Sequence, residues 1–445
     1  MKQSVRFLRV LTRATLGLLA GYGLAHAAEP ATSLVVHCGT LIDPAVAAQP
    51  MTERSIVVEQ GRVARVERGF VSAPADAQTV DLREATCMPG FIDTHTHLTM
   101  DYSKDAYLSQ FVDSDGDVAY KAARHAKLVL LAGFTTVRDL GGLHLVDVAL
   151  RNAIERGDVP GPRMLVATKT LSISGGHADP SGGFREDLFH ITEADGVVDG
   201  VDSAIRGTRI AIKRGADVIK VTATGGVMSV ADHGSGPQFN ASELRAIVET
   251  ASTHQLKVAA HAHGDEGAYL AVVAGAASIE HGTYLTPKTY ELMKRNNVYL
   301  VPTVIAGVSV AEAAKTPGFF PPSVAAKALE IGPLMVAALG RAWKAGVPIA
   351  FGTDSGVFAH GRNAREFGYM VEAGMPPFEA IRTATQNAAD LLGRSEDLGS
   401  LQPGRFADLI AVTGDPLADI RVLERIQFVM KQGRIYKADG AAVVF

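Results

Sequence analysis

The sequence predicts an α/β protein in which a (β/α)8 TIM barrel carries a small β-sandwich domain supplied by both ends of the chain. Two observations predict this fold. Short strand-like segments fill residues 32–86 and recur over 407–436, whereas strand-like and helical segments alternate between those regions. Within the alternating region, histidine, lysine and aspartate residues stand at the ends of several strand-like segments, where TIM barrels place their chemistry.

The length and charge of the chain exclude several classes of function. Its 445 residues, 47% of them hydrophobic, are enough for a barrel with an accessory domain. The 43 basic residues are balanced by 47 acidic ones, which gives a net charge of −4. This balance creates no attraction to nucleic acid or to an anionic membrane, so we expect neither as a partner.

The N-terminus has the pattern of a secretory signal peptide over residues 1–27. An apolar run covers 14–25, small residues form an A-x-A cleavage site at 25–27, and basic residues precede the run: Lys2, Arg6, Arg9 and Arg13. The run is too short for a membrane-spanning helix, although an uncleaved anchor is the alternative. We therefore expect a periplasmic or secreted protein that has no membrane contact after signal cleavage.

The chain has only two cysteines, Cys38 and Cys87, and each lies in or beside a strand-like segment. An exported protein could pair them, but a chain of this size does not need a disulfide for its stability. Because buried cysteine packs as a small hydrophobic residue, we expect two buried free thiols and assign them no function.

The two strand-rich regions predict a single domain. The first has candidate strands at 33–38, 55–58, 62–66 and 79–82, with turns at Gly39 and Gly61. The same pattern of short strand-like segments and turns recurs near the C-terminus, with candidate strands at 407–412, 422–423, 426–430 and 433–436. We predict that residues 28–86 and 401–445 together form the β-sandwich domain.

The region 87–400 has the repeats expected of a barrel. Its candidate strands are 90–97, 135–140, 164–170, 217–224, 257–263, 278–283, 299–303 and 348–353. Helical patterns between them include 118–132, 204–214, 241–254 and 377–392, and glycines suited to helix C-caps precede several strands: Gly133, Gly215, Gly275 and Gly346. A doubly wound open sheet is the alternative, but no glycine-rich phosphate-binding fingerprint follows the first strand.

The ends of these candidate strands are unusually polar. The first ends in His95 and His97, which lie on one face because side chains alternate along a strand. Later strand ends carry Lys220, the pair His261 and His263, Glu280 beside His281, and Thr353 beside Asp354. One such histidine is usually a core residue and one such aspartate a helix cap, but these strand ends meet at one mouth of a closed barrel. Together they predict a metal site.

The same residues carry a resemblance to a known family. The first-strand motif 91–97, together with Glu280-His281-Gly282 and Gly352-Thr353-Asp354, resembles the amidohydrolase superfamily. Segments 218–221, 224–229 and 261–264 are similar to those of exported Xaa-Pro and Xaa-Arg dipeptidases, acyl-amino-acid carboxypeptidases and ochratoxin amidohydrolases, which are close to imidazolonepropionase-like proteins. The resemblance covers nearly the whole mature chain, and it specifies metal ligands better than substrates.

The resemblance implies a binuclear site for two divalent metal ions, which we expect to be Zn²⁺. The implied ligands are His95, His97 and Asp354 on the more buried metal, and His261 and His281 on the more exposed one. Lys220 would bridge both metals as an N-carboxylysine formed with CO₂, because an ammonium group would repel the cations whereas a carbamate offers them two oxygens. His263 is the alternative ligand to His261, since both face the same way on one strand.

The implied reaction is hydrolysis of an amide bond by a metal-activated hydroxide. Asp354 would accept the proton of the nucleophile and pass it to the leaving amine, while His263 or His177 would help to polarise the carbonyl group. We therefore expect a peptidase or carboxypeptidase that cleaves dipeptides or N-acyl amino acids. The alternative is hydrolysis of an aryl amide such as ochratoxin, of a cyclic amide or of a lactone in the same site.

The loops after the strands should select the substrate. We expect 182–186, 230–239 and 316–322 to wall the site, with Phe319 and Phe320 over an apolar acyl group. The candidates for binding a substrate carboxylate are Arg185, Lys169 and Arg362. A metal-free interaction protein on the same scaffold would have lost ligand residues, and this sequence retains all of them. The sequence leaves a homo-oligomer open.

Overall fold

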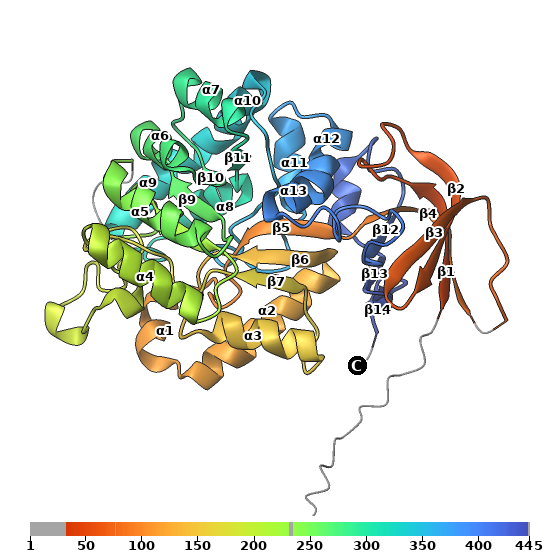
Figure 1. The fold of residues 1–445 in the computed structure, drawn as a ribbon, viewed down its shortest axis with the longest axis horizontal. Coiled ribbons are helices and arrows are strands. Elements are labelled where there is room, and N and C mark those ends of the chain that lie inside the picture. The colour runs from red at the N-terminus through yellow and green to blue at the C-terminus, as the bar shows by residue number, and fades with distance from the viewer. Residues whose placement is uncertain (1–32, 76, 231–234, 444–445) are drawn as a thin grey trace, which may run out of the picture.

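The structure is a computed structural model, and it describes residues 33–75, 77–230 and 235–443. Figure 1 shows a strand-rich part, made from the two ends of the chain, lying beside a larger part in which strands are surrounded by helices. The predicted signal peptide, 1–27, lies outside the described residues.

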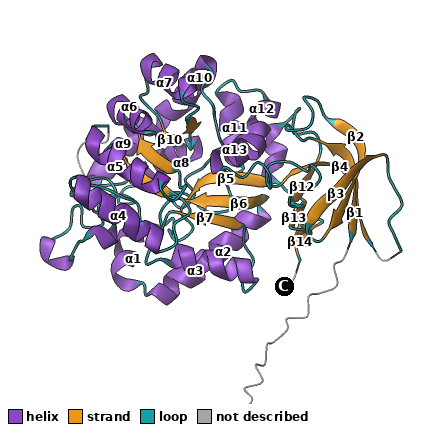
Figure 2. Cartoon of the chain, viewed as in Figure 1, coloured by secondary structure: helices purple, strands orange, loops and turns teal. Residues whose placement is uncertain are grey.

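The strand-rich part is one hydrogen-bonded sheet in the order β15-β14-β13-β12-β4-β1-β2-β3. Antiparallel pairing of β12 with β4 joins the C-terminal strands to the N-terminal ones (Figure 2). Buried side chains from both groups of strands share one hydrophobic core. The strands are β1 (Leu34–Leu41), β2 (Met51–Glu59), β3 (Arg62–Arg68), β4 (Gln78–Pro89), β12 (Leu409–Thr413), β13 (Phe428–Lys431), β14 (Arg434–Ala438) and β15 (Ala441–Ala442).

One predicted strand in this part is wrong. Residues 422–423 lie in a short 3₁₀ helix, η5 (Ile420–Glu424). The Asp419 side chain accepts a hydrogen bond from the Arg421 backbone N–H and thereby caps this turn. Two apolar residues are too few to distinguish a strand from a helical turn.

The expectation of two free thiols is also wrong. Cys38 on β1 and Cys87 on β4 form a disulfide, with their Cα atoms 5.9 Å apart. The two strands pair in parallel, and a register shift follows Cys38. Both cysteines are buried, as expected, but the pairing depends on which strands become neighbours, and local patterns do not reveal that.

The described residues of the larger part form seven parallel strands in two ladders, β5-β6-β7 and β8-β9-β10-β11. Isolated parallel bridges link Leu171 to Val221, Leu300 to Ile349 and Thr96 to Ser355, so the pairings continue around a ring. This is an α/β fold of TIM-barrel type. The strands are β5 (Phe91–Thr96), β6 (Phe134–Asp139), β7 (Arg163–Val166), β8 (Ile219–Thr222), β9 (Val258–Ala262), β10 (Ser278–His281) and β11 (Tyr299–Val301).

The predicted eighth strand, 348–353, is not a continuous strand: bridges at Ile349 and, just beyond it, at Ser355 mark its place, and Phe351 O accepts a hydrogen bond from the Thr94 backbone N–H. Pro348 lacks a backbone N–H and so cannot donate to a ladder. Asp354, at the far end, has a φ of 61°, which takes the chain out of the extended conformation.

Helices surround the parallel strands (Figure 2). Capping boxes begin two of them, formed by Ser114 with Asp117 and by Asn240 with Glu243. The helices are α1 (Ala106–Val112), α2 (Asp115–Leu131), α3 (Val146–Arg156), α4 (Val201–Lys213), α5 (Ala241–Ser252), α6 (Asp265–Ala274), α7 (Pro287–Arg295), α8 (Val304–Ala314), α9 (Pro322–Ile331), α10 (Met335–Ala345), α11 (Arg365–Glu372), α12 (Pro377–Arg382) and α13 (Ala388–Leu392). A π-helical turn, η4 (Thr383–Asn387), joins the last two, so the predicted helix 377–392 is one interrupted helical stretch.

The helical stretch 322–345 is long and apolar enough to cross a membrane by length and composition alone. Here it packs as a core element, because Ala328, Ile331, Met335 and Leu339 are buried in the main hydrophobic core. The burial of these residues explains its apolar composition within the globular fold.

Candidate metal centre

The strand ends bring the six predicted metal ligands into one cluster. His95 lies on β5 and His97 directly follows it. Lys220 lies on β8, His261 on β9 and His281 on β10, and Asp354 follows the eighth strand segment. In a ring of parallel strands all these ends face the same way, so the cluster lies at one mouth of the fold.

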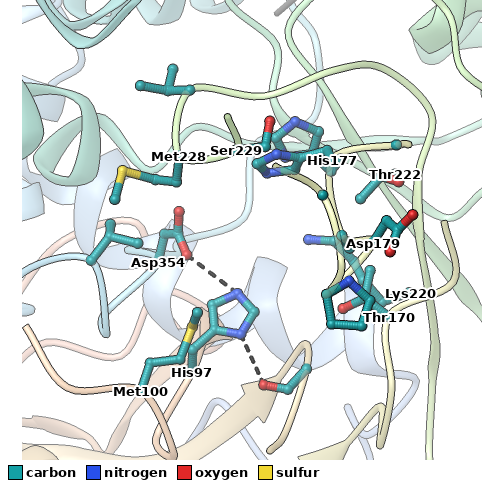
Figure 3. A pocket seen from close by; sticks show the side chains of 18 of the residues that line it. His97, Met100, Thr170, His177, Asp179, Lys220, Thr222, Met228, Ser229 and Asp354 are labelled. Carbon is teal, nitrogen blue, oxygen red and sulfur yellow. Dashed lines mark hydrogen bonds and ion pairs between the residues drawn. The ribbon is translucent and has the colours of Figure 1, made fainter. Parts of the chain in front are cut away.

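Short distances join these side chains. Asp354 Oδ1 lies 3.3 Å from His97 Nε2, a contact drawn in Figure 3, and 3.5 Å from His95 Nε2. Lys220 Nζ lies 3.4 Å from His95 Nε2. Single ligand atoms of His95, His281 and Asp354 all lie within 4.8 Å of one another, close enough to share one ion.

In each of the four candidate ligand histidines, one ring nitrogen contacts an oxygen atom of a residue outside the candidate ligand set. A carbonyl or carboxylate oxygen can only accept, so the nitrogen facing it carries the proton and the other nitrogen keeps its lone pair. Three contacts are of this kind: His95 Nδ1 to Glu280 Oε2 (2.8 Å), His97 Nδ1 to Gly141 O (3.0 Å) and His261 Nε2 to Gly225 O (3.1 Å). His281 Nδ1 lies 2.7 Å from Thr303 Oγ1, a hydroxyl that can donate or accept.

This donor set fits divalent metal ions. Neutral imidazoles and a carboxylate are ordinary zinc ligands, and their second nitrogens are held as metal-binding histidines usually are. The ammonium form of Lys220 does not fit, because its charge would oppose any cation beside His95. A carboxylated Lys220 would fit, since it would add two oxygens and a negative charge at this position.

Burial favours the neutral form of the titratable side chains in the cluster. It lowers the pKa of all six histidines at this mouth, and the pKa of His97 falls to about 4. Burial also lowers the pKa of Lys220 and raises that of Asp354. The imidazoles are therefore neutral at pH 7, the form that binds metal, and the lysine is more readily neutral, the form that reacts with CO₂.

The backbone takes uncommon conformations at three places around the cluster. His281, Thr303 and Asp354 have φ values of 72°, 47° and 61°, in the left-handed region that non-glycine residues rarely occupy. These residues end β10, follow β11 and follow the eighth strand segment. Two of them, His281 and Asp354, belong to the candidate ligand cluster, and outliers of this kind concentrate at functional sites.

His263 and His177, the predicted helpers, both lie beside the cluster. The His263 ring stacks on that of His281 with centroids 5.0 Å apart, and its Nδ1 contacts Thr283 Oγ1 at 2.8 Å. The His177 ring stacks on that of His261 at 4.4 Å, and its buried Nδ1 has no hydrogen-bond partner in the described part of the chain. A Cβ at Gly226 would lie 2.3 Å from the His177 ring, so this loop approaches the ring as only glycine allows.

A cavity of about 390 Å³ opens over the cluster, within the range of small-molecule sites. Figure 3 shows His97 and Asp354 facing one another in it, with Met100 and Met228 nearby and His177 across the space. Gly182, Phe184 and Val230 also line it, from two of the loops predicted to do so. None of 316–322 lines it, so the predicted placement of Phe319 and Phe320 is wrong; Phe319 packs on Tyr102 instead.

Of the three candidate carboxylate-binding side chains, only Lys169 lines the cavity. Arg185 makes a two-pronged bond to Asp187 at 2.8 and 2.6 Å and is exposed, and Arg362 is also exposed. Lys169 makes no hydrogen bond or ion pair within the described residues, although Asp195 and Asp147 lie near enough to oppose the burial that lowers its pKa. Among the three candidates, Lys169 is therefore the cation that the described structure places at the cavity.

Sequence reasoning assigned no role to several buried charged residues that support the cluster. Asp93 accepts hydrogen bonds from the backbone of His95 and Thr353 and from the side chain of Asn363, tying the first and eighth strand segments together. Arg138 and Glu280 form a buried ion pair at 2.9 Å beneath His95. Charged residues inside apolar strands were the available signal, because a buried charge requires a partner.

Comparison with known proteins decides the family. The model of the Amidohydrolase family matches residues 86–436. The chain belongs to the amidohydrolase family. As an amidohydrolase it is a hydrolase of amide bonds, in a family that is typically metal-dependent and acts on small molecules.

Individual relatives cover almost the whole chain. Ochratoxinase from Aspergillus niger is 33% identical over 438 residues, covering 93% of this amidohydrolase and 88% of that protein. The crystal structure of a Xaa-Pro dipeptidase with methionine bound in the active site has 42% sequence identity and a TM-score of 0.89, covering 92% of this chain and 100% of that one. Imidazolonepropionase from Geobacillus thermodenitrificans is 26% identical over 431 residues, covering 88% of this chain and 90% of that protein.

Proposed function

We propose that this amidohydrolase is a binuclear, zinc-dependent peptidase of the carboxypeptidase type that cleaves dipeptides or N-acyl amino acids. The observation that carries the proposal is the convergence of His95, His97, Lys220, His261, His281 and Asp354 at one mouth of the fold. We further propose that the fold is a closed (β/α)8 barrel with a β-sandwich formed by both chain ends.

In this proposal His95, His97 and Asp354 would hold one metal ion, and His261 and His281 would hold the other. Lys220, if carboxylated on Nζ, would supply further oxygen ligands. Two bound divalent ions supply Lewis acidity, which lowers the pKa of water and polarises an amide carbonyl. The neutral state of the buried imidazoles and the lowered pKa of Lys220 support these assignments.

The chain's own residues then handle the proton and the carbonyl oxygen. Asp354 Oδ1 lies at the centre of the cluster and accepts the proton of the attacking water, then returns it to the leaving nitrogen. His177, whose buried Nδ1 has no hydrogen-bond partner among the described residues, and His263 lie beside the cluster, and each ring can donate to the carbonyl oxygen as negative charge develops.

The position of Lys169 supports a substrate that ends in a free carboxylate. An ammonium without a bonded partner at a partly buried cavity wall is stabilised when an anion binds there. The leaving group of a dipeptide or N-acyl amino acid carries such a carboxylate. The similarity to a Xaa-Pro dipeptidase agrees with this substrate class.

The second candidate is hydrolysis of an aryl amide such as ochratoxin, with cyclic amides and lactones as further possibilities in the same site. The 33% identity to ochratoxinase favours it. Turnover of N-acyl amino acids and of ochratoxin by the same protein distinguishes the two candidates.

The test uses the chain loaded with zinc and bicarbonate. Turnover is measured on N-acyl-proline, N-acyl-arginine and N-acyl-phenylalanine panels, with ochratoxin as the aryl amide, and metal content is measured on the same sample. We expect about two zinc ions per chain and turnover in at least one acyl-amino-acid panel. Failure on all panels would reject the peptidase, and less than about one metal per chain would reject the binuclear site.

We also propose that the protein is exported, to the periplasm or the medium. The 1–27 sequence supports this, and so does the Cys38–Cys87 disulfide, because such bonds persist in oxidising compartments. Mass spectrometry of the N-terminus of the exported protein should find cleavage after Ala27. An intact N-terminus in the membrane fraction would contradict the proposal.

A further inference from the structure

The histidine contacts around the cluster are not equivalent. His97 and His261 turn their second nitrogen to a backbone carbonyl, and His281 turns its own to a hydroxyl. Of these four, only His95 turns that second nitrogen to a carboxylate, with Nδ1 2.8 Å from Glu280 Oε2. Both side chains are almost completely buried, at 1% and 0% exposure, so water does not weaken the contact.

The other oxygen of Glu280 is held separately. Arg138 donates from Nη2 to Oε1 at 2.9 Å and Ser278 donates its hydroxyl to the same oxygen. Arg138 is itself fixed, with Nε 2.6 Å from Thr94 O and Nη1 3.2 Å from Ser278 Oγ. The carboxylate therefore has one oxygen for Arg138 and one for His95.

His95 is also the histidine at the centre of the cluster. Its Nε2 lies 3.4 Å from Lys220 Nζ and 3.5 Å from Asp354 Oδ1. A neutral imidazole with its proton on Nε2 could not offer a lone pair to these neighbours or to a metal. The tautomer of this ring therefore decides whether the cluster can hold an ion.

We propose that Glu280 is a positioning residue that locks His95 in the tautomer protonated on Nδ1, with Arg138 as the fixed counter-charge that orients the carboxylate. The inference rests on the proposed metal site and deepens it. A carboxylate behind a ligating histidine fixes the ring and raises its basicity, and loss of such a partner weakens metal binding by roughly 10- to 100-fold.

A purely structural role for the Arg138–Glu280 pair is the competing explanation. The pair links β6 to β10 across 142 residues of chain, so breaking it could lower stability without altering the metal site. Arg163 and Asp408 provide a matched control. They form another largely buried pair, at 2.8 Å, and neither lines the cavity.

The experiment measures zinc release from the full chain into a chromogenic chelator, together with the melting temperature. We expect Glu280→Gln to release zinc roughly 10- to 100-fold faster than wild type. Asp408→Asn should lower the melting temperature yet release zinc at the wild-type rate. Equal release by wild type and Glu280→Gln would overturn the inference.

Glu280→Gln leaves the Arg138 charge buried and unpaired, which could prevent folding. The double variant Arg138→Met/Glu280→Met removes both charges and replaces them with apolar side chains. We expect it to fold and still to release zinc at least about 10-fold faster; wild-type release would overturn the inference. A wild-type chain that binds no metal would overturn the proposed function itself, and this inference with it.

Discussion

Replacing Asp354 with Asn tests the proposed chemistry most directly. The residue sits at a φ of 61°, a conformation that asparagine tolerates better than most residues, and its backbone N–H donates to His95 O at 2.7 Å. The fold should therefore survive. The amide keeps an oxygen in the place of Asp354 Oδ1, 3.3 Å from His97 Nε2, that can still act as a metal ligand, but it cannot accept the proton of the attacking water.

The loss should be large because one residue performs both proton transfers. General acid–base catalysis contributes about 10²- to 10⁴-fold, so we expect kcat to fall by about 10³-fold, equivalent to ~4 kcal/mol of transition-state stabilisation. The assay is steady-state hydrolysis of the best acyl-amino-acid substrate, with zinc content measured in parallel. Most of the metal should be retained, because the four histidines and Lys220 remain.

Asp195→Asn is the matched control for this variant. Asp195 also lines the cavity, but one of its oxygens accepts both hydrogen bonds from Thr192, and an amide oxygen can accept them equally well. We expect its kcat to stay within a few-fold of wild type. A zinc-loaded Asp354→Asn variant that hydrolyses substrate within 10-fold of wild type would refute the proton-transfer role.

Three further predictions follow from other parts of the structure. Lys169→Met should raise KM by about 10- to 100-fold for substrates with a free carboxylate, leave kcat nearly unchanged and not affect the matching amide-capped substrates, as steady-state kinetics would show. Replacing Cys38 and Cys87 with alanine opens a cross-link between residues 49 apart, which should lower the unfolding free energy by about 4 kcal/mol in denaturant titrations. Burial lowers the pKa of His360 from 6.5 to about 3, so below about pH 6.5 the unfolded chain binds a proton that the folded chain does not. The unfolding free energy therefore decreases as the pH is lowered, by about 2 kcal/mol at about pH 5. The unfolding free energy of the His360→Gln variant, measured by denaturant titration at pH 7 and pH 5, should decrease by about 2 kcal/mol less than that of wild type.

One pair of candidate ligands, His95 and His97, could be picked out from short-range geometry alone. His95 and His97 are two residues apart, and a strand places such residues on one face whatever surrounds it. The predicted helices were similarly accessible, since the capping pairs Ser114–Asp117 and Asn240–Glu243 are local in the chain. Such features depend only on residues that are a few positions apart in the sequence.

Other features depend on contacts between distant segments. The Cys38–Cys87 disulfide requires β1 to pair with β4, and the wall of the cavity depends on how loops fold back, so Phe319 and Phe320 were misplaced. The partner of His95 is Glu280, 185 residues later in the chain. Composition and spacing identify such residues as candidates for a functional role, but they do not show which of them are in contact in the folded protein.

The left-handed residues show why the site could not be completed from local rules. His281, Thr303 and Asp354 are not glycines, and no sequence pattern requires positive φ at any of them. Each such conformation costs roughly 1–2 kcal/mol, and the surrounding packing must supply that energy. The buried bonds of Asp93 to Thr353 and of Glu366 to the backbone N–H groups of Val304 and Ile305 hold the chain next to two of these residues. The mouth of the fold is therefore shaped by interactions outside the ligand set, so substitutions at these supporting carboxylates should disturb the geometry of the site even though none of them touches a metal.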